Sequence, residues 1–438
     1  MPGPVGTAAS PRRGAGLLAV LLTIYALAYL DRQIISLLVE PLKADLSISD
    51  VEVSFLQGMA FVLFYTLCGL PLGYAVDRFA RRWVVLAGVV VWSCSSAAGA
   101  FAETYHQLLF ARFGVGAGEA ALLPAAYSMI GDAVDRSRLS RSMSIFSLGA
   151  TVGGALALGL GGLIAGYAAD IGGITVPVLG HFKPWQVVFL AIGSMGIPAA
   201  LLILAIREPT RTDPITEKRS GRFDAAHFAQ NWGFYLCHIA GFSLLCMLIA
   251  AVIAWQPSFM LRSFGWDIRK VGGALGALHM VGGILGMLGG GILADHLQKR
   301  GYGDAHFRIY VFVLPIVMLV GMATYWSGSL WIALVGIGVT GIVSPFIGVA
   351  ASGLALGTPP NRRGLTSAVF LFAYNLVGFG LGPMVAAWLA GHGPAGGGLG
   401  WALGLMFAII TPLVVGIFWI GLRPMRKAVA AVKALESR

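Results

Sequence analysis

Four charged residues lie inside stretches that are otherwise apolar, and their types and spacing suit proton chemistry. Asp31 and Arg32 are adjacent, and Arg112 precedes Glu119 by seven residues, about two helical turns, so those two share one helix face. An ionised carboxylate in an apolar region is costly, so it normally pairs with a cation, faces water or takes up a proton. We expect Asp31, Glu119 and Arg112 to form a cluster, with Arg32 on a different side of its helix.

Two interpretations of this cluster are open. Burial favours a neutral carboxyl group and a nearby guanidinium favours a carboxylate, so a group balanced between them can bind and release protons. On this interpretation Asp31, Glu119, Arg112 and Arg32 couple the protein to proton movement. The alternative is a permanently charged network that holds two helices together.

Other catalytic and cofactor signatures do not fit the chain, which is not predicted to be an enzyme. A G-x-G-x-x-G match at 336–341 lies inside an apolar stretch with no strand before it, so no nucleotide cofactor is predicted. The four cysteines all lie in apolar stretches without C-x-x-C spacing, so neither a disulfide framework nor a metal site is predicted. H-E-x-x-H, Walker and G-x-S-x-G motifs do not occur in a suitable context.

The elements that must hold these charges are membrane helices. Of the 438 residues, 57% are hydrophobic and 11% charged, whereas soluble domains are about half apolar and about one quarter charged. This composition excludes a soluble enzyme, and its hydrophobicity excludes a disordered chain. Twelve apolar runs are long enough to span a bilayer, which takes about 20 residues. They are 16–38, 53–76, 83–102, 107–131, 142–168, 185–206, 232–260, 269–294, 308–326, 329–352, 364–390 and 399–422.

The runs form two sets of six, separated by the only long polar stretch. We therefore predict an all-α integral membrane protein with an N-terminal six-helix bundle (1–206), a cytoplasmic connector (207–230) and a C-terminal six-helix bundle with a cytoplasmic tail (231–438). Alternate sides hold about 23 and about five Lys and Arg residues. The basic side includes both termini, so both are predicted to be cytoplasmic. The net charge of +11 is then a topology signal, and no nucleic-acid partner is predicted.

The two halves also repeat a loop sequence. Residues 73–82 read GYAVDRFARR and residues 291–300 read GILADHLQKR, each in the loop after the second span of its half. Both have G-x-x-x-D followed by a basic pair at the same offset. A duplicated six-helix unit predicts a transporter with its binding site between the halves.

The first of these loops resembles the G-x-L-a-D-R-x-G-R-[RK] motif of the major facilitator superfamily, with alanine at the usual leucine and second glycine positions. The R-x-x-x-G sequence at 112–116 resembles a further motif of that superfamily. The stretches YLDRQIIS (29–36), ARFGVGAGEA (111–120) and GFGLGP (378–383) resemble the Spinster family of lysophospholipid and sphingosine-phosphate carriers. The composition and short loops are typical of a bacterial member, in the cytoplasmic (inner) membrane.

The superfamily resemblance implies a gate on the cytoplasmic side. Asp77 is expected to face the helix start at Arg362 and Arg363, and Arg81 is expected to meet Asp132. The predicted gate residues are Gly73, Asp77, Arg78, Arg81, Asp132, Asp295, Arg362 and Arg363. For Arg78, Arg82 and Arg300 an equal alternative is that they are solvated charges that only set the membrane topology.

Polar and aromatic residues within the spans are candidates for the wall of a substrate cavity. They are Gln33, Phe242, His279, Thr340, Phe370, Tyr374 and Asn375. His279 is expected either to titrate near neutral pH or to bond a headgroup, although packing is the commoner role of a single histidine. The others equally fit contacts to neighbouring helices or to lipid.

These features together predict a secondary transporter in the membrane bilayer, without cofactor or metal and expected to be a monomer. Its substrate is predicted to be an amphiphile, either a lysophospholipid or a sphingoid-type lipid, with protons as the coupling ion. The first alternative is a proton-coupled exporter of drugs or small organic ions. A passive lipid scramblase or a membrane scaffold is the second, and it would not need the buried acids.

Overall fold

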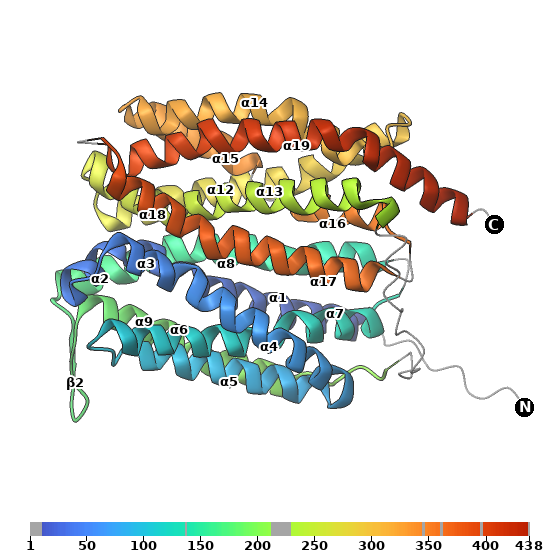
Figure 1. The fold of residues 1–438 in the computed structure, drawn as a ribbon. Coiled ribbons are helices and arrows are strands. Elements are labelled where there is room, and N and C mark those ends of the chain that lie inside the picture. The colour runs from blue at the N-terminus through green and yellow to red at the C-terminus, as the bar shows by residue number, and fades with distance from the viewer. Residues whose placement is uncertain are drawn as a thin grey trace, which may run out of the picture. The chain divides into compact units, whose positions relative to one another are not determined.

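The computed structural model describes residues 11–135, 138–211, 229–343, 347–359, 362–394 and 397–436. These residues are almost entirely helical, as Figure 1 shows. Among them, 11 helices are long and apolar enough to cross a membrane, and Leu330–Ile342 is a shorter apolar helix. The predicted all-α membrane fold is confirmed, and the shorter helix lies within the tenth predicted span, 329–352.

The helices of the first half run from α1 to α10, and a short hairpin lies between α8 and α9. The helices are α1 (Pro11–Ile34), η1 (Ile35–Leu37), α2 (Val39–Leu46), α3 (Asp50–Gln57), α4 (Met59–Arg78), α5 (Arg81–Gly99), α6 (Tyr105–Glu119), α7 (Leu122–Ala133), α8 (Leu139–Asp170), α9 (Pro184–Ser194) and α10 (Gly196–Ala205). The antiparallel hairpin pairs β1 (Ile174–Val176) with β2 (Gly180–Phe182), with Ile174 opposite Phe182.

The helices of the second half run from α12 to α19. They are α12 (Trp232–Phe264), α13 (Ile268–Lys299), α14 (Ala305–Trp326), α15 (Leu330–Val343), α16 (Ile347–Leu356), α17 (Arg363–Ala373), the π-helix η5 (Tyr374–Leu381), α18 (Gly382–His392) and α19 (Gly398–Glu436).

Several predicted spans are built from two helices, and proline explains two of these interruptions. Pro124 has no N–H to donate to the carbonyl of Ala120, and α6 ends at Glu119 just before that point. Pro198 likewise has no N–H for the carbonyl of Ser194, where α9 ends. The break after α6 therefore falls directly beside one of the charged candidates.

Glycine explains a third interruption, between α3 and α4. A Cβ at Gly58 would lie 2.2 Å from the carbonyl oxygen of Phe379, so only glycine permits this approach of α3 to η5.

The chain forms two compact units. The first contains residues 1–48, 60–216 and 267–276, and the second contains 49–59, 217–266 and 277–438. The division predicted from the polar stretch at 207–230 stays a prediction, and residues 212–228 lie outside the described part of the chain.

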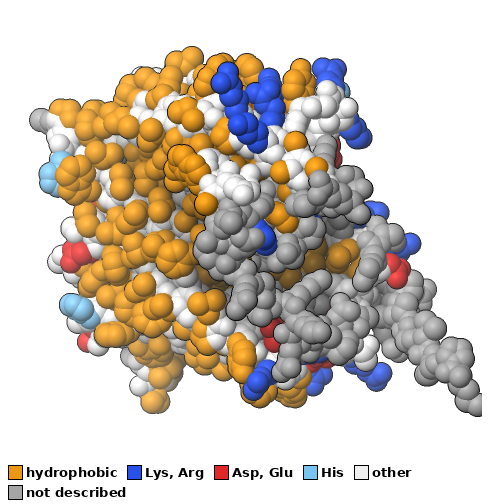
Figure 2. Space-filling model, turned by 45° about the vertical axis from the view of Figure 1, so that its right-hand side comes forward, with side chains coloured by type: hydrophobic (Ala, Val, Ile, Leu, Met, Phe, Trp, Pro, Cys, Tyr) orange, Lys and Arg blue, Asp and Glu red, His pale blue; other side chains and the backbone are white. Residues whose placement is uncertain are grey.

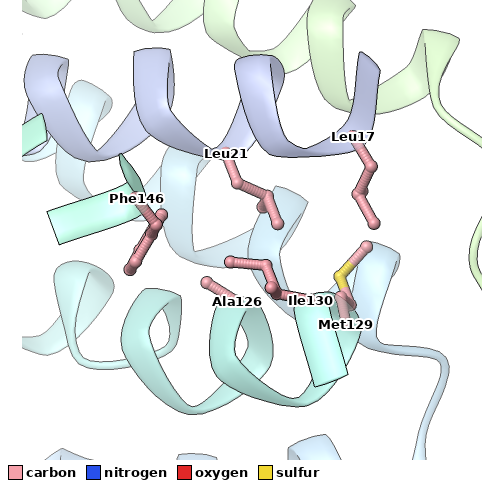
Figure 3. Packing of buried hydrophobic residues seen from close by; sticks show 6 residues of the cluster. All are labelled: Leu17, Leu21, Ala126, Met129, Ile130 and Phe146. Atoms are coloured by element: carbon pink, nitrogen blue, oxygen red, sulfur yellow. The ribbon is translucent and has the colours of Figure 1, made fainter. Parts of the chain in front are cut away.

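The first unit has a buried core where α1, α7 and α8 meet. Figure 3 shows Leu17 and Leu21 of α1 above Ala126, Met129 and Ile130 of α7, with Phe146 of α8 at the side. Each of these side chains is at most 5% exposed. This packing holds α1 at a fixed register, and α1 carries Asp31 and Arg32.

The second unit has an aromatic core. The rings of Phe242, Phe307 and Phe418 lie within 6.2 Å of one another, measured between centroids, and all three are buried. The ring of His238 packs 4.7 Å from that of Phe242.

Hydrophobic side chains cover much of the surface that is not grey in Figure 2. Leu70 is 80% exposed, Trp331 77% and Phe110 69%. Burial of apolar surface is the dominant stabilising term in folding, so this much exposed apolar surface is compatible with a lipid environment and not with water.

Candidate functional site

The first unit brings the four buried charged candidates together as two ion pairs. Arg32 Nη2 lies 2.7 Å from Glu119 Oε2, and Arg112 Nη1 lies 3.4 Å from Asp31 Oδ1. Asp31, Arg112 and Glu119 are each at most 2% exposed, and the Arg32 side chain is 16% exposed. We call these four residues the charged cluster.

The sequence did not predict how the members of the cluster pair. Arg32, which was expected on a different side of its helix from Asp31, is the cation that pairs with Glu119. The long arginine side chain explains this, because its guanidinium lies several bonds from the backbone that sets the helical angle. Each carboxylate consequently has its own guanidinium, and the net charge of the cluster is zero.

Uncharged residues complete the surroundings of the cluster, and sequence reasoning did not find them. Ser96 Oγ donates a hydrogen bond of 3.1 Å to Asp31 Oδ1. The Arg32 guanidinium carbon lies 4.8, 4.1 and 5.3 Å from the ring centroids of Tyr29, Phe61 and Tyr65. These distances are those of cation–π contacts, so three rings and one carboxylate hold Arg32 in place.

The cluster retains polar atoms without partners. Among the described residues nothing bonds Glu119 Oε1, Arg32 Nε, or Nε and Nη2 of Arg112, and all four atoms are buried. An unpaired buried polar atom costs about 1–3 kcal/mol, and more when the group is charged. The site can therefore gain from a proton on Glu119, from water, or from a polar group of a ligand.

A second charged site surrounds Arg81, whose side chain is 1% exposed. Arg81 forms ion pairs with Asp132 and with Glu208, the latter at 3.1 Å, and donates to Ser128 Oγ at 2.8 Å. The structure thus brings together Arg81 and Asp132, which were predicted to meet. Their role as a gate is a prediction that this contact does not test.

The polar stretch after α10 contributes two residues that sequence reasoning missed. Glu208 accepts hydrogen bonds from the backbone and side chain of Arg81, at 2.9 and 3.1 Å. Arg211 donates to the backbone oxygens of Val76 and Phe79, each at 2.7 Å, and to that of Asp77. These carbonyls end α4, where the negative end of the helix dipole attracts a cation.

The remaining gate candidates make other contacts or belong to the second unit. Arg78 lies over the ring of Tyr74, 4.8 Å from its centroid. A Cβ at Gly73 would meet nothing within 4 Å, so packing does not require glycine there. Asp77 belongs to the first unit, whereas Asp295, Arg362 and Arg363 belong to the second. The Asp77 contact to the 362–363 helix start stays a prediction.

Three polar cavity candidates make defined hydrogen bonds. His279 Nε2 lies 2.9 Å from Gln256 Oε1. Thr340 Oγ1 donates to the carbonyl of Gly336 at 2.8 Å, within its own helix. Gln33 Nε2 lies 3.4 Å from Ser36 Oγ.

The aromatic candidates divide by burial. Phe242 and Phe370 are at most 2% exposed and pack around His238, at centroid distances of 4.7 and 5.2 Å. Tyr374 and Asn375 are half-buried at the start of the π-helix η5. Such helices occur often at functional sites. Their cavity role remains a prediction.

In the described ranges no group of three or more His, Cys, Asp or Glu residues could hold a metal ion.

Comparison with protein families and curated proteins gives related sequences along most of the chain. The model of the family described as Major Facilitator Superfamily matches residues 21–381. An MFS-type efflux pump of Mycolicibacterium smegmatis is 27% identical over 396 residues, covering 87% of this chain and 85% of that protein. Protein spinster of Drosophila melanogaster is 27% identical over 292 residues, 64% of this chain. The chain spans only 46% of the length of that protein.

Solved structures share the fold along nearly the whole chain. A bacterial homologue of the human lysosomal transporter Spinster, crystallised inward-facing and unoccupied, has a TM-score of 0.74 and 24% identity, covering 97% of this chain and 98% of that one. Its inward-facing, occupied structure has a TM-score of 0.73 and 25% identity, covering 97% and 96%. A D-xylose–proton symporter, at 16% identity and a TM-score of 0.68, shares the fold.

Proposed function

Because the chain belongs to the major facilitator superfamily, we propose that it is a secondary active transporter that moves an amphiphilic substrate by alternating access, driven by protons. That it is a multi-pass membrane transporter follows from the family and from its apolar helices. The substrate, the coupling ion and the mechanism are the proposal.

The charged cluster is the observation that carries proton coupling. Two carboxylates are nearly inaccessible within membrane helices, and each has one guanidinium partner. Glu119 also keeps one oxygen without a partner in the described residues, where a proton would sit. In the proposed cycle Glu119 and Asp31 take up protons from one side, weaken their hold on the arginines, and release the protons to the other side.

A lysophospholipid or sphingoid-type lipid is the proposed cargo. Its support is the similarity to protein spinster and to the bacterial Spinster homologue, whose structures match nearly the whole chain. The exposed face of Arg32, framed by aromatic rings, is suited to an amphiphile that combines a polar group with an apolar chain.

A proton-coupled exporter of drugs or small organic ions is the second candidate. The M. smegmatis efflux pump favours it, because that protein matches more of this chain than protein spinster does. The same charged cluster would serve either cargo.

The gate proposed for the basic side is built on Arg81. Its pairs with Asp132 and Glu208 tie the start of α5 to the end of α7 and to the segment after α10. Asp77, Arg362, Arg363 and the remaining predicted gate residues would join in the closed state. The basic side is proposed to be cytoplasmic, with the protein in a bacterial inner membrane.

Transport by purified protein in liposomes tests the proposal. Labelled lysophospholipid and a cationic dye are offered separately, with and without a pH gradient. We expect lysophospholipid to accumulate only with the gradient. Accumulation of the dye alone would support the exporter, and gradient-independent movement of lipid in both directions would indicate a scramblase.

The variant Glu119→Gln separates proton coupling from structure. It should lose gradient-driven accumulation at least tenfold, yet retain exchange of labelled for unlabelled substrate, because exchange needs no net proton movement. Glu103→Gln, an exposed loop carboxylate, is the matched control and should behave as wild type. Unchanged accumulation by Glu119→Gln would refute coupling through the cluster.

A further inference from the structure

Three polar side chains form a hydrogen-bonded chain in the second unit, apart from the charged cluster. His279 Nε2 on α13 lies 2.9 Å from Gln256 Oε1 on α12. Gln256 Nε2 in turn donates to the hydroxyl of Tyr325 on α14 at 3.2 Å. Gln256 is 1% exposed and Tyr325 5%, whereas His279 is only half-buried.

This chain fixes the proton arrangement of the imidazole ring. The amide nitrogen of Gln256 is engaged by Tyr325, so its oxygen faces His279, and an amide oxygen can only accept. With the amide in this orientation, His279 Nε2 carries the hydrogen that is donated. In the neutral ring the other nitrogen, Nδ1, then has a lone pair and no hydrogen.

The Nδ1 atom is available to a ligand. No hydrogen bond to it comes from the described residues, and it is not one of the fully buried polar atoms without a partner. Polar groups inside membrane helices are energetically costly and usually have a function.

His279 lies on the protein-facing side of α13. Gly282, Gly283 and Gly286 share the helical face of His279 and are all buried. The opposite face carries Val281 and Leu288, each 58% exposed. His279 thus points away from the apolar stripe that suits lipid, toward the interior.

We infer that His279 Nδ1 accepts a hydrogen bond from the polar end of the transported substrate. Gln256 and Tyr325 are positioning residues that hold the ring and its tautomer. The inference rests on the proposed amphiphilic cargo and specifies it: the cargo carries a hydrogen-bond donor, a hydroxyl or a protonated amine, at this point. A phosphate or carboxylate oxygen without a proton would not be recognised.

Binding to the purified full-length protein tests this with three probes. Lysophosphatidylethanolamine has both a free glycerol hydroxyl and an ammonium group. Its 2-deoxy analogue lacks the hydroxyl. Its N,N,N-trimethyl analogue, lysophosphatidylcholine, keeps the positive charge but has no N–H to donate. Wild type should bind one analogue about tenfold more weakly than the parent, because the acceptor is left unpaired, and that analogue identifies the donor.

Substitutions at His279 separate its two nitrogens. His279→Gln places an amide near Nε2 and keeps the contact to Gln256, but has no atom at Nδ1, so it should bind parent and analogue equally. His279→Asn places an amide near Nδ1 and should retain most of the discrimination. Tyr325→Phe should reduce, but not abolish, the difference in affinity between the parent lipid and that analogue. His392→Gln, at an exposed histidine, is the matched control and should discriminate as wild type does.

Two results would overturn the inference, and both can be distinguished from failure of the proposed lipid cargo. If wild type binds all three probes equally, or if His279→Gln discriminates as wild type does, the subsite is refuted and the proposed lipid cargo is not. Wild type that binds none of the three removes the proposed lipid cargo and this subsite with it.

Discussion

Arg32 has the chemistry that is hardest to replace in the charged cluster. Its guanidinium pairs with Glu119 at 2.7 Å and contacts the rings of Tyr29, Phe61 and Tyr65. A lysine keeps the charge but loses the flat surface that stacks on rings and the spread of donors. We predict that Arg32→Lys lowers gradient-driven transport about tenfold in liposomes.

Arg423→Lys is the matched control for this prediction, because Arg423 is exposed near the end of α19. It should leave transport at the wild-type rate. If Arg32→Lys also transports at that rate, charge alone suffices at this position and the aromatic surroundings have no role in transport.

The sequence indicated which residues could form the cluster but not how they pair. Charges inside apolar runs are rare, so Asp31, Arg112 and Glu119 stood out at once. The Arg32–Glu119 pair was not predicted, because a helical wheel shows only the direction in which each side chain leaves the backbone. The arginine side chain is long enough to reach a partner in another direction. Ser96 was missed because a hydroxyl is common in membrane helices and gives no signal of its own.

At the level of helices, α1 and α8 depend on a glycine for their approach. A Cβ at Gly153 would lie 2.2 Å from the carbonyl oxygen of Ala26 and 2.8 Å from Cβ of Tyr29. A Cβ at the neighbouring Gly154 would meet nothing within 4 Å. Gly153→Ala should therefore destabilise the protein by about 1–3 kcal/mol through overpacking.

Gly154→Ala is the control, and it should be neutral or stabilising by up to about 1 kcal/mol from helix propensity. Thermal unfolding in detergent measures both variants. Because Tyr29 contacts Arg32, Gly153→Ala should also reduce transport. Equal melting temperatures for the two variants would mean that α1 and α8 tolerate a wider separation.

The ends of α5 and α7 are joined through Arg81. Arg81→Gln would leave the carboxylates of Asp132 and Glu208 without their cation. Loss of a buried pair costs about 3–5 kcal/mol and of an exposed pair about 0–1 kcal/mol. These carboxylates are 16% and 22% exposed, so we predict roughly 2 kcal/mol of destabilisation, between these limits.

The exposed Arg78 is the control for this loop. Arg78→Gln should change the melting temperature little, because its only described partner is the ring of Tyr74. A similar loss of stability in both variants would mean that net charge, and not the Arg81 pairs, stabilises the loop.

The spans were predictable as apolar runs, but their interruptions were not. Pro124 and Pro198 lie in runs whose hydrophobicity is continuous, so run length alone joins α6 to α7 and α9 to α10. The break at Gly58 depends on Phe379, more than 300 residues away in sequence, and no local pattern contains that contact. The π-helix at Tyr374–Leu381 likewise has the composition of its neighbours.

For the molecule as a whole, the distribution of charge predicts the orientation in the membrane. About 23 Lys and Arg residues fall on one predicted side and about five on the other. The all-helical membrane class followed from composition, because 57% hydrophobic residues leave few alternatives. A division at the polar stretch does not reproduce the compact units. Segment 49–59 precedes that stretch but belongs to the second unit, and segment 267–276 follows it but belongs to the first.

Labelling of single cysteines tests the orientation. Helix α8 has 32 residues, about 48 Å, so it crosses the bilayer and puts Asp135 and the hairpin residue Val178 on opposite sides. Both are exposed. With the four native cysteines replaced, a membrane-impermeant maleimide that has passed the outer membrane should label Val178→Cys in intact cells. It should label Asp135→Cys only after the inner membrane is permeabilised, because Asp135 lies on the basic side, which is predicted to be cytoplasmic. The reverse pattern would mean that the basic loops face outward. In the proposed cycle, protons from outside would then enter the charged cluster from the side on which Arg81 is paired.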